Sequence, residues 1–135
     1  PKIIEETHAR MRENYHSSGG TWKRWMMPRT AMVFLDTTPG WSAEARTQKA
    51  KQTAENAWRN YWRAMEGTLD PTKVKDAVAN TLAGDPTELA RQIKEKYHPE
   101  DRLMLWFDFN NHDNANVKSS MRNFYEQVAP QLGSK

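Results

Sequence analysis

The sequence predicts an α/β fold with parallel strands. Residues 29–36 and 103–109 are short, nearly continuous apolar runs, and helical patterns occupy most of the chain between them. Strands that helices separate are normally parallel neighbours joined by a right-handed crossover, and such strands are buried on both faces. Two parallel strands alone leave both sheet edges open and cannot close a core. We therefore expect the last part of a larger sheet, incomplete as a single chain.

The first half of the chain begins with a predicted helix at 2–17. Apolar and aromatic side chains, together with one histidine, recur about four residues apart on one face of it, at Ile4, His8, Met11 and Tyr15. A Ser-Ser-Gly-Gly stretch ends this helix, and Pro28 leads into the strand at 29–36. Ser42 is a good N-cap for a long helix that runs to about residue 65.

The second half twice uses Asp followed by Pro as a helix start signal. Asp70-Pro71 opens a short helix that Gly84 is expected to close, and Asp85-Pro86 opens another that runs to about residue 97. The strand at 103–109 follows. The last helix, 116–128, is expected to turn four apolar side chains inward, those of Val117, Met121, Phe124 and Val128.

Composition limits the classes of function. The 135 residues include 20 Lys and Arg against 17 Asp and Glu, and no Cys. The excess charge of +3 is too small and scattered to favour nucleic acid or an anionic membrane as a partner. The lack of Cys excludes disulfides and Cys-bearing zinc sites. No apolar run approaches the roughly 18 residues of a membrane span, and the N-terminus does not resemble a signal peptide. These features predict a cytoplasmic protein, although six Trp residues and a mean hydropathy of -0.97 are unusual for a self-contained globule.

Three motifs near the end of the chain carry a resemblance to a known family. They are GDPTELARQI at 84–93, DRLMLWFD at 101–108 and SMRNFYEQVAP at 120–130. In this order and spacing they resemble the C-terminal end of the bacterial-luciferase-like flavin-dependent monooxygenases. Residues 29–65, a strand followed by a helix that begins with Glu44-Ala45-Arg46, are similar to the seventh unit of that family. The resemblance covers nearly the whole chain, but only roughly the last two-fifths of a typical member.

The resemblance implies the C-terminal part of a (β/α)8 TIM-type barrel, namely units seven and eight with the preceding helix. Strand seven would be 29–36, and strand eight would be 103–109. The expected divisions of the chain are an outer helix and loop at 1–28, strand seven and its helix at 29–65, a mobile lid segment at 66–84, and a helix, strand eight and the final helix at 85–135.

The same resemblance implies a cofactor and partners. The parent enzyme would use reduced FMN and O2 to oxidise a small organic substrate, or the deazaflavin F420 in a variant of the reaction. A flavin reductase would supply the reduced cofactor, and the enzyme would be a homodimer or heterodimer. Most flavin contacts would lie in the N-terminal part of the same barrel. The isolated chain is therefore expected to be inactive and to bind reduced flavin only weakly.

Candidate site residues follow the two predicted strands, because the functional face of a barrel lies at the C-terminal ends of its strands. Asp36 follows the first strand, and Asp108, Asn110 and Asn111 lie at the end of the second. These side chains could bind the edge of a flavin ring or a substrate, but Asp and Asn are also ordinary turn residues. His112 is a weak candidate for a catalytic base, since the flavin carries most of the chemistry.

The long helix carries two further groups. Trp58, Tyr61 and Trp62 share one side of it, where they either pack the helix on the sheet or form an apolar lid over the substrate. Its basic residues, Arg46, Lys49 and Lys51, are expected to form a solvated face.

Motifs for other chemistry are missing from the sequence. The four His residues lack a ligand-like spacing, and there is no P-loop, GxSxG or GxGxxG. A second class of function stays open beside the enzyme. In that class the chain is a non-enzymatic helical interaction module whose strands complete the sheet of a partner.

Overall fold

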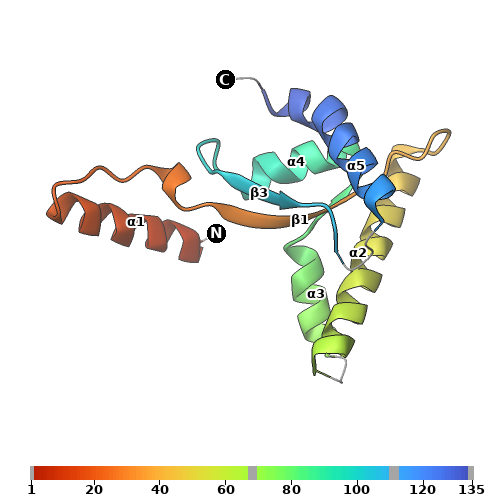
Figure 1. Ribbon diagram of the computed structural model, residues 1–135, viewed down its shortest axis with the longest axis horizontal. Helices are drawn as coiled ribbons and strands as arrows, with labels where there is room; N and C mark the ends of the chain where they lie inside the picture. The colour runs from red at the N-terminus through yellow and green to blue at the C-terminus, as the bar shows by residue number, and fades with distance from the viewer. Residues whose placement is uncertain (1, 67–69, 110–112, 134–135) are drawn as a thin grey trace.

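The computed structural model describes residues 2–66, 70–109 and 113–133, which form a three-stranded parallel sheet with helices packed on it (Figure 1). The strands are β1 (Arg29–Leu35), β2 (Leu82–Gly84) and β3 (Leu103–Trp106), in the spatial order β2-β1-β3. Phe34 of β1 pairs with Ala83, and Thr30 pairs with Met104. The α/β class is confirmed, as is the parallel pairing of the two strands that the sequence predicts.

The helices begin where the capping residues predict. Ser42 Oγ accepts a hydrogen bond from the Ala45 amide at 3.2 Å, and the Asp85 carboxylate accepts one from Glu88 at 2.9 Å. Asp70 caps its helix through the Thr72 amide in the same way. The elements are α1 (Lys2–Ser17), η1 (Arg24–Met26), α2 (Ala43–Glu66), α3 (Pro71–Ala79), α4 (Pro86–Lys96) and α5 (Asn114–Asn123), which a π turn, η2 (Phe124–Val128), and a 3-10 turn, η3 (Ala129–Leu132), continue.

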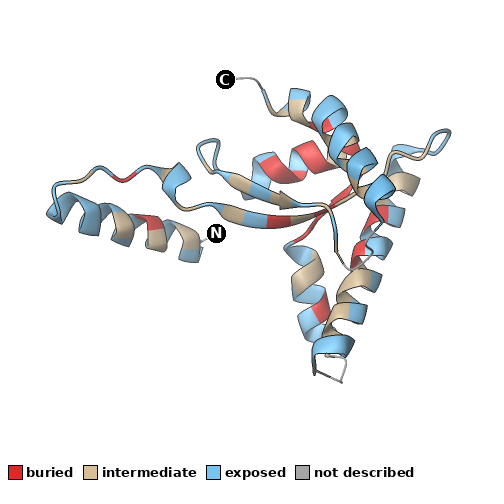
Figure 2. Cartoon of the chain, in the orientation of Figure 1, coloured by how far each residue is buried: buried red, intermediate tan, exposed pale blue. Residues whose placement is uncertain are grey.

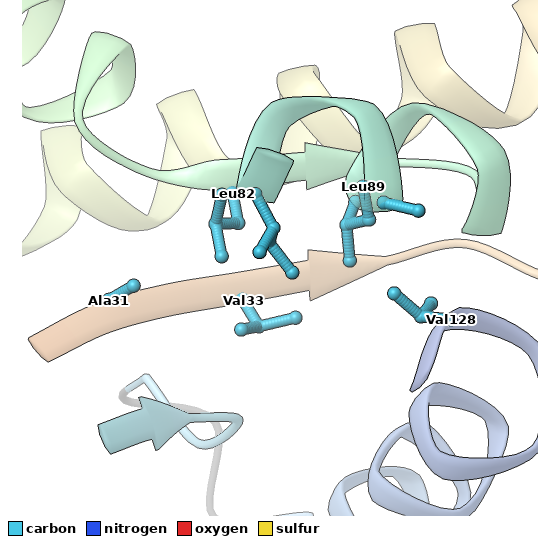
Figure 3. Packing of buried hydrophobic residues seen from close by; sticks show 7 residues of the cluster. Ala31, Val33, Leu82, Leu89 and Val128 are labelled. Atoms are coloured by element: carbon cyan, nitrogen blue, oxygen red, sulfur yellow. The ribbon is translucent and has the colours of Figure 1, made fainter. Parts of the chain in front are cut away.

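The core lies on both faces of the sheet. Alternate residues of a strand point to opposite faces, and Val33 packs against α4 and Val128 while Phe34 packs against α2. Figure 3 shows the first of these clusters, in which Leu82 of β2 and Leu89 of α4 are completely buried. Burial of each such leucine stabilises the fold by about 2 kcal/mol. Helices α2 and α4 therefore cover opposite faces of the sheet.

Strand β2 corrects two expectations. The sequence predicted a helix extending through Leu82 to Gly84, and it predicted a mobile or poorly packed segment at 66–84, of which 67–69 lie outside the described residues. Instead α3 ends at Ala79, and all three residues of β2 are buried. Leu82 reaches the core between β1 and α4, and Gly84 lets α4 approach closely, since a Cβ there would lie 2.7 Å from Glu88 Cγ. Burial of this tripeptide thus outweighs the helical pattern that precedes it.

The last helix corrects one further expectation. Val128 is buried, and Val117 and Phe124 are half-buried, but Met121 is 51% exposed. The face of α5 turned toward the sheet is partly polar, because Asn123 Nδ2 donates to Thr37 Oγ1 at 2.8 Å. The π turn that follows then shifts the phase of the helix and brings Val128 into the core. The prediction that Met121 faces inward was wrong.

Helix α1 and the segment after it form an arm beside the layered part of the molecule. Figure 1 shows α1 projecting away from the sheet, and Figure 2 shows that most of its surface is exposed. The arm has a small centre of its own, where Trp22 Nε1 donates a hydrogen bond to His8 Nδ1 at 3.2 Å. Both side chains are buried. Arg24 attaches the arm to the start of the sheet, because it shares the Asp101 carboxylate with Arg29, the first residue of β1.

His8 is expected to make the arm sensitive to pH. Burial lowers the pKa of His8, and the nearby Arg24 lowers it further, while Asp101 and Glu5 act in the opposite direction. Protonation would place a hydrogen on Nδ1, which now accepts from Trp22. Because the folded pKa lies below the ordinary 6.5, neutral His8 stabilises the fold above that pH, and this contribution is lost as the pH falls.

Urea unfolding at about pH 7.5 and about pH 5 measures this loss. The His8→Leu variant should lose less stability on acidification than the wild type does. Exposed His16 provides the control: His16→Gln should lose as much free energy of unfolding between the two pH values as the wild type does. An equal response of all three proteins would contradict the assignment.

The strand order differs from that of a closed barrel. Three successive strands of a (β/α)8 barrel lie side by side in chain order, and all helices lie outside. Here β1 lies between the other two strands, with α2 and α4 on opposite faces. This arrangement is that of a small, open, doubly wound sheet. No closed barrel is present among the described residues.

Candidate functional site

A pocket opens at the carboxyl ends of β1 and β3. The chain leaves β1 toward β2 on one side and later returns to β3 on the other, so these two ends form a topological switch point. Ligands of open α/β sheets bind outside the carboxyl ends of the strands at such a point. The cavity has a volume of about 240 Å3, and a second hollow of about 230 Å3 shares several of its lining residues. The pocket has a polar wall and an aromatic wall.

Asp36 and Lys49 are the charged pair of the polar wall. The Asp36 carboxylate accepts from the Thr38 amide at 2.9 Å, and Lys49 Nζ lies 3.2 Å from its other oxygen. Burial alone would raise the pKa of Asp36, but the hydrogen bonds from Thr38 and the Lys49 ammonium outweigh burial and hold the pKa below its usual value. Asp36 is therefore ionised near neutral pH. Lys49 also donates to Thr38 Oγ1 and lies over the Trp41 ring.

Two helices fix the loop that follows β1. Arg46 Nε of α2 donates to the Thr38 carbonyl at 2.9 Å, and Asn123 of α5 binds Thr37. The same face of α5 contributes Asn116 and Ser120 to the pocket lining. Side-chain amides and hydroxyls both donate and accept hydrogen bonds. The polar wall can therefore orient a ligand that carries both kinds of group.

Phe109 is the centre of the aromatic wall. Its ring centroid lies 4.6 Å from that of Trp58, 5.5 Å from that of Tyr61 and 6.3 Å from that of Phe34. Trp58 is held in place, because its Nε1 donates to Thr81 Oγ1 at 2.8 Å. Aromatic pairs at these separations stabilise one another by about 1 kcal/mol beyond burial. The wall is a fixed apolar surface that joins β1, α2 and the segment after β3.

The structure places the predicted site residues as follows. Asp36 lines the pocket, whereas Asp108 is exposed and is not part of its lining. Asn110, Asn111 and His112 lie outside the described residues. The predicted lid residues Trp58, Tyr61 and Trp62 do form one aromatic group, and the first two contact Phe109 at the strand end.

Sequence reasoning missed several residues of the pocket. Lys49 was expected to be solvated with its basic neighbours, yet it binds Asp36 in the polar wall. Lys49 lies one helical turn beyond Ala45 and Arg46, on the side of α2 that faces the loop after β1. This spacing could have indicated that Lys49 points toward the loop. No local pattern marks Asn116 or Ser120, because the rotation of α5 about its axis decides where they point.

Only part of a flavin would fit this arrangement. The cavity is smaller than the roughly 300–1,000 Å3 of a usual ligand pocket. An aromatic wall beside hydrogen-bonding groups suits one edge of a planar ring. Lys49 in the lining already binds Asp36, and Arg46 of the same helix binds the Thr38 carbonyl, so neither cation is free to hold a phosphate. Within 2–66, 70–109 and 113–133, no cluster of His, Asp or Glu could hold a metal ion.

Comparison with family models, curated proteins and solved structures finds no match to the chain. In the same described ranges, no helix is both long enough and apolar enough to cross a membrane.

Proposed function

We propose that the chain is part of a flavin-dependent oxidoreductase similar to the luciferase-like monooxygenases, and that the strand-end pocket forms part of its ligand-binding face. One observation carries the proposal. Polar and aromatic side chains from two strand ends and two helices converge on one cavity at the switch point of the sheet. Asp36, one of the candidates predicted from the sequence, lies in the polar wall of this cavity. The order and spacing of the three C-terminal motifs supply the choice of family.

The roles of this chain's own residues follow from the two walls. Phe109, with the Trp58 ring packed against it, would exclude water from one side of a bound ring, while Asn116 and Ser120 would orient its polar edge. Lys49, with Asp36 fixing its position, would donate a hydrogen bond to an acceptor on the ligand. Reduced FMN, or F420 in the variant reaction, would supply the electrons for the reaction. A flavin reductase and the N-terminal part of the barrel are the proposed partners.

If the chain is part of a barrel, the position of β2 beside β1 has to be accounted for. With 29–36 as strand seven, a sixth strand would pair with the edge of β1 opposite β3, and β2 occupies that edge in the structure. The proposed barrel therefore requires Leu82–Gly84 to leave this position, or requires β2 itself to serve as a barrel strand.

A flavin titration tests the proposed division of the cofactor contacts. The 135-residue chain, titrated anaerobically with reduced FMN, should show no saturable binding in the submicromolar range. Two strand ends offer too few convergent groups to offset the entropy that a flavin loses on binding. Tight binding, followed by flavin fluorescence, would mean that these residues contain the whole site.

One observation favours a second candidate, the non-enzymatic module that completes the sheet of a partner. The alternate residues Met104 and Trp106 of β3 are both about half exposed, on the face of the sheet where α2 packs against Phe34 of β1 and Ala83 of β2. The mass of the native polypeptide separates the two candidates. A product longer than about 300 residues, the size range of a barrel enzyme, favours the oxidoreductase, and a product of 135 residues favours the module.

A further inference from the structure

The two outer edges of the sheet differ. At the β2 edge, the Gln92 side chain of α4 takes the place of a neighbouring strand. Its Nε2 donates to the Ala83 carbonyl at 2.9 Å, and its Oε1 accepts from the Ala83 amide at 3.2 Å. Lys96 Nζ donates to the Thr81 carbonyl just before the strand. Side chains of α4 therefore close this edge against another strand.

The β3 edge has no such cover within the described residues. Arg29 pairs with Leu103, and the Arg29 amide donates to the Arg102 carbonyl at 2.9 Å. In a parallel ladder this pattern turns the backbone groups of residues 102, 104 and 106 toward β1. The N–H and C=O groups of Leu103 and Leu105 consequently point outward. Within the described residues, no side chain and no other backbone segment forms a hydrogen bond with these outward groups.

The sequence of this open edge is complementary to itself in the antiparallel sense. Exposed and half-buried residues alternate without a break from 102 to 108, as in an extended strand with one covered face. A two-fold axis at Leu105 places Arg102 opposite Asp108 of a second copy, and Met104 opposite Trp106. The two residues of each pair lie on the same exposed face. Opposite charges and a sulfur–aromatic pair thus face one another on both sides of the axis.

We propose that the 135-residue chain forms a two-fold dimer through antiparallel pairing of β3 with β3 of a second copy. Leu105 would exchange both backbone hydrogen bonds with its equivalent, since its outward groups match a hydrogen-bonded antiparallel pair. Leu103 would pair with Phe107 in the same way. The two sheets would join into one sheet of six strands. Its two outer edges would be the β2 edges, each closed by the Gln92 side chain.

This dimer goes beyond the proposed enzyme and uses a different surface. The residues that pair, 102–108, include one lining residue of the strand-end pocket, Phe107, and its side chain faces the covered side of the sheet. A polypeptide in which another strand covers β3 would not form the dimer. Flavin binding and dimerisation can therefore fail independently.

Cross-linking tests the register, and the lack of native Cys makes the result simple to interpret. The Met104→Cys and Trp106→Cys variants, mixed and exposed to oxidised glutathione, should give a disulfide-linked dimer on a non-reducing gel. Positions 104 and 106 of opposite copies face one another in this register, whereas 104 and 104, or 106 and 106, lie on a diagonal too long for a disulfide. Either variant oxidised alone should stay mostly monomeric on the gel. Cross-linking in the single-variant samples to the same extent, or none in the mixture, would overturn the register.

Charge reversal tests the pairing without touching the core. Arg102→Glu should weaken dimerisation about tenfold in sedimentation equilibrium, because two symmetry-related attractions become repulsions. The double variant Arg102→Glu with Asp108→Arg should restore it. Reversal of an exposed charge elsewhere, Arg122→Glu, should leave the dissociation constant unchanged. A monomeric wild-type chain at all concentrations, or a double variant no tighter than the single one, would overturn the proposal.

Discussion

Asp101→Asn is expected to lower the free energy of unfolding by about 3 kcal/mol. The Asp101 carboxylate has no exposed area, and it accepts from Arg24 Nε at 2.8 Å, from Arg29 Nη1 at 3.1 Å and from the His98 amide at 3.0 Å. Asparagine keeps the size of the side chain but removes its charge. Two largely buried guanidinium groups would then share no buried counter-ion, and the arm would lose its attachment to the sheet.

Glu5 provides a matched control, because it binds the same Arg24 from the surface. The Glu5 side chain is 63% exposed, so solvent screens its ion pair and Glu5→Gln should change stability far less than Asp101→Asn does. Urea unfolding of the two variants measures the difference. Comparable losses would contradict the view that burial of the Asp101 carboxylate makes it the main anchor of the arm.

The effect of Asp101→Asn should also depend on pH. Burial alone would raise the pKa of Asp101, but the hydrogen bonds from Arg24, the His98 amide and Arg29 hold it below the ordinary 3.8. The folded pKa is thus lower than the unfolded one, so the stabilisation is complete well above pH 4 and is lost as the pH falls through the folded value. The difference between wild type and variant should therefore shrink in acid.

Leu82→Ala is expected to cost about 3 kcal/mol of folding free energy. Leu82 is fully buried among Val33, Leu89 and Val128, where the neighbouring backbone cannot easily close the space left by a smaller side chain (Figure 3). Met65→Ala, at a position that is mostly exposed, should cost less than about 0.5 kcal/mol. Urea unfolding followed by circular dichroism compares the two variants.

Amide exchange checks the same strand without mutation. Exchange at Leu82–Gly84 should be as slow as in β1, whereas the exposed turns of α3 should exchange faster. Fast exchange across the whole of 70–84 would restore the original expectation of a poorly packed segment.

Local signals account for the elements that the sequence predicts correctly. Three helices begin with a side chain that accepts a hydrogen bond from a free backbone amide, namely Ser42, Asp70 and Asp85. Such a cap can be recognised from three or four consecutive residues. The apolar runs of β1 and β3 are equally local. Strand β2 is not, because three residues between two helices carry too short a pattern. Its assignment depends on the core that Leu82 enters and on the Gln92 side chain that closes its edge.

The sequence predicted the part of the candidate site that lies at a strand end. Asp36 follows directly from the end of β1. Lys49, Asn116 and Ser120 enter the pocket only because α2 and α5 are turned to present them, and side-chain type alone does not reveal a rotation about a helix axis. Phe109 was assigned to the second strand by the sequence, yet its role as the centre of the aromatic wall depends on Trp58, which is distant in the chain.

Anaerobic titration of the isotopically labelled chain with reduced FMN, followed by amide chemical shifts, is the most direct test of the pocket as a ligand site. We expect binding in about the millimolar range, consistent with a partial site. The shifts should concentrate at residues of the two walls, Asp36, Lys49, Phe109, Asn116 and Ser120. Lys49→Met should reduce these shifts, and Lys51→Met, at an exposed position of the same helix, should not. Shifts centred elsewhere on the molecule, or the same response in both lysine variants, would contradict the account.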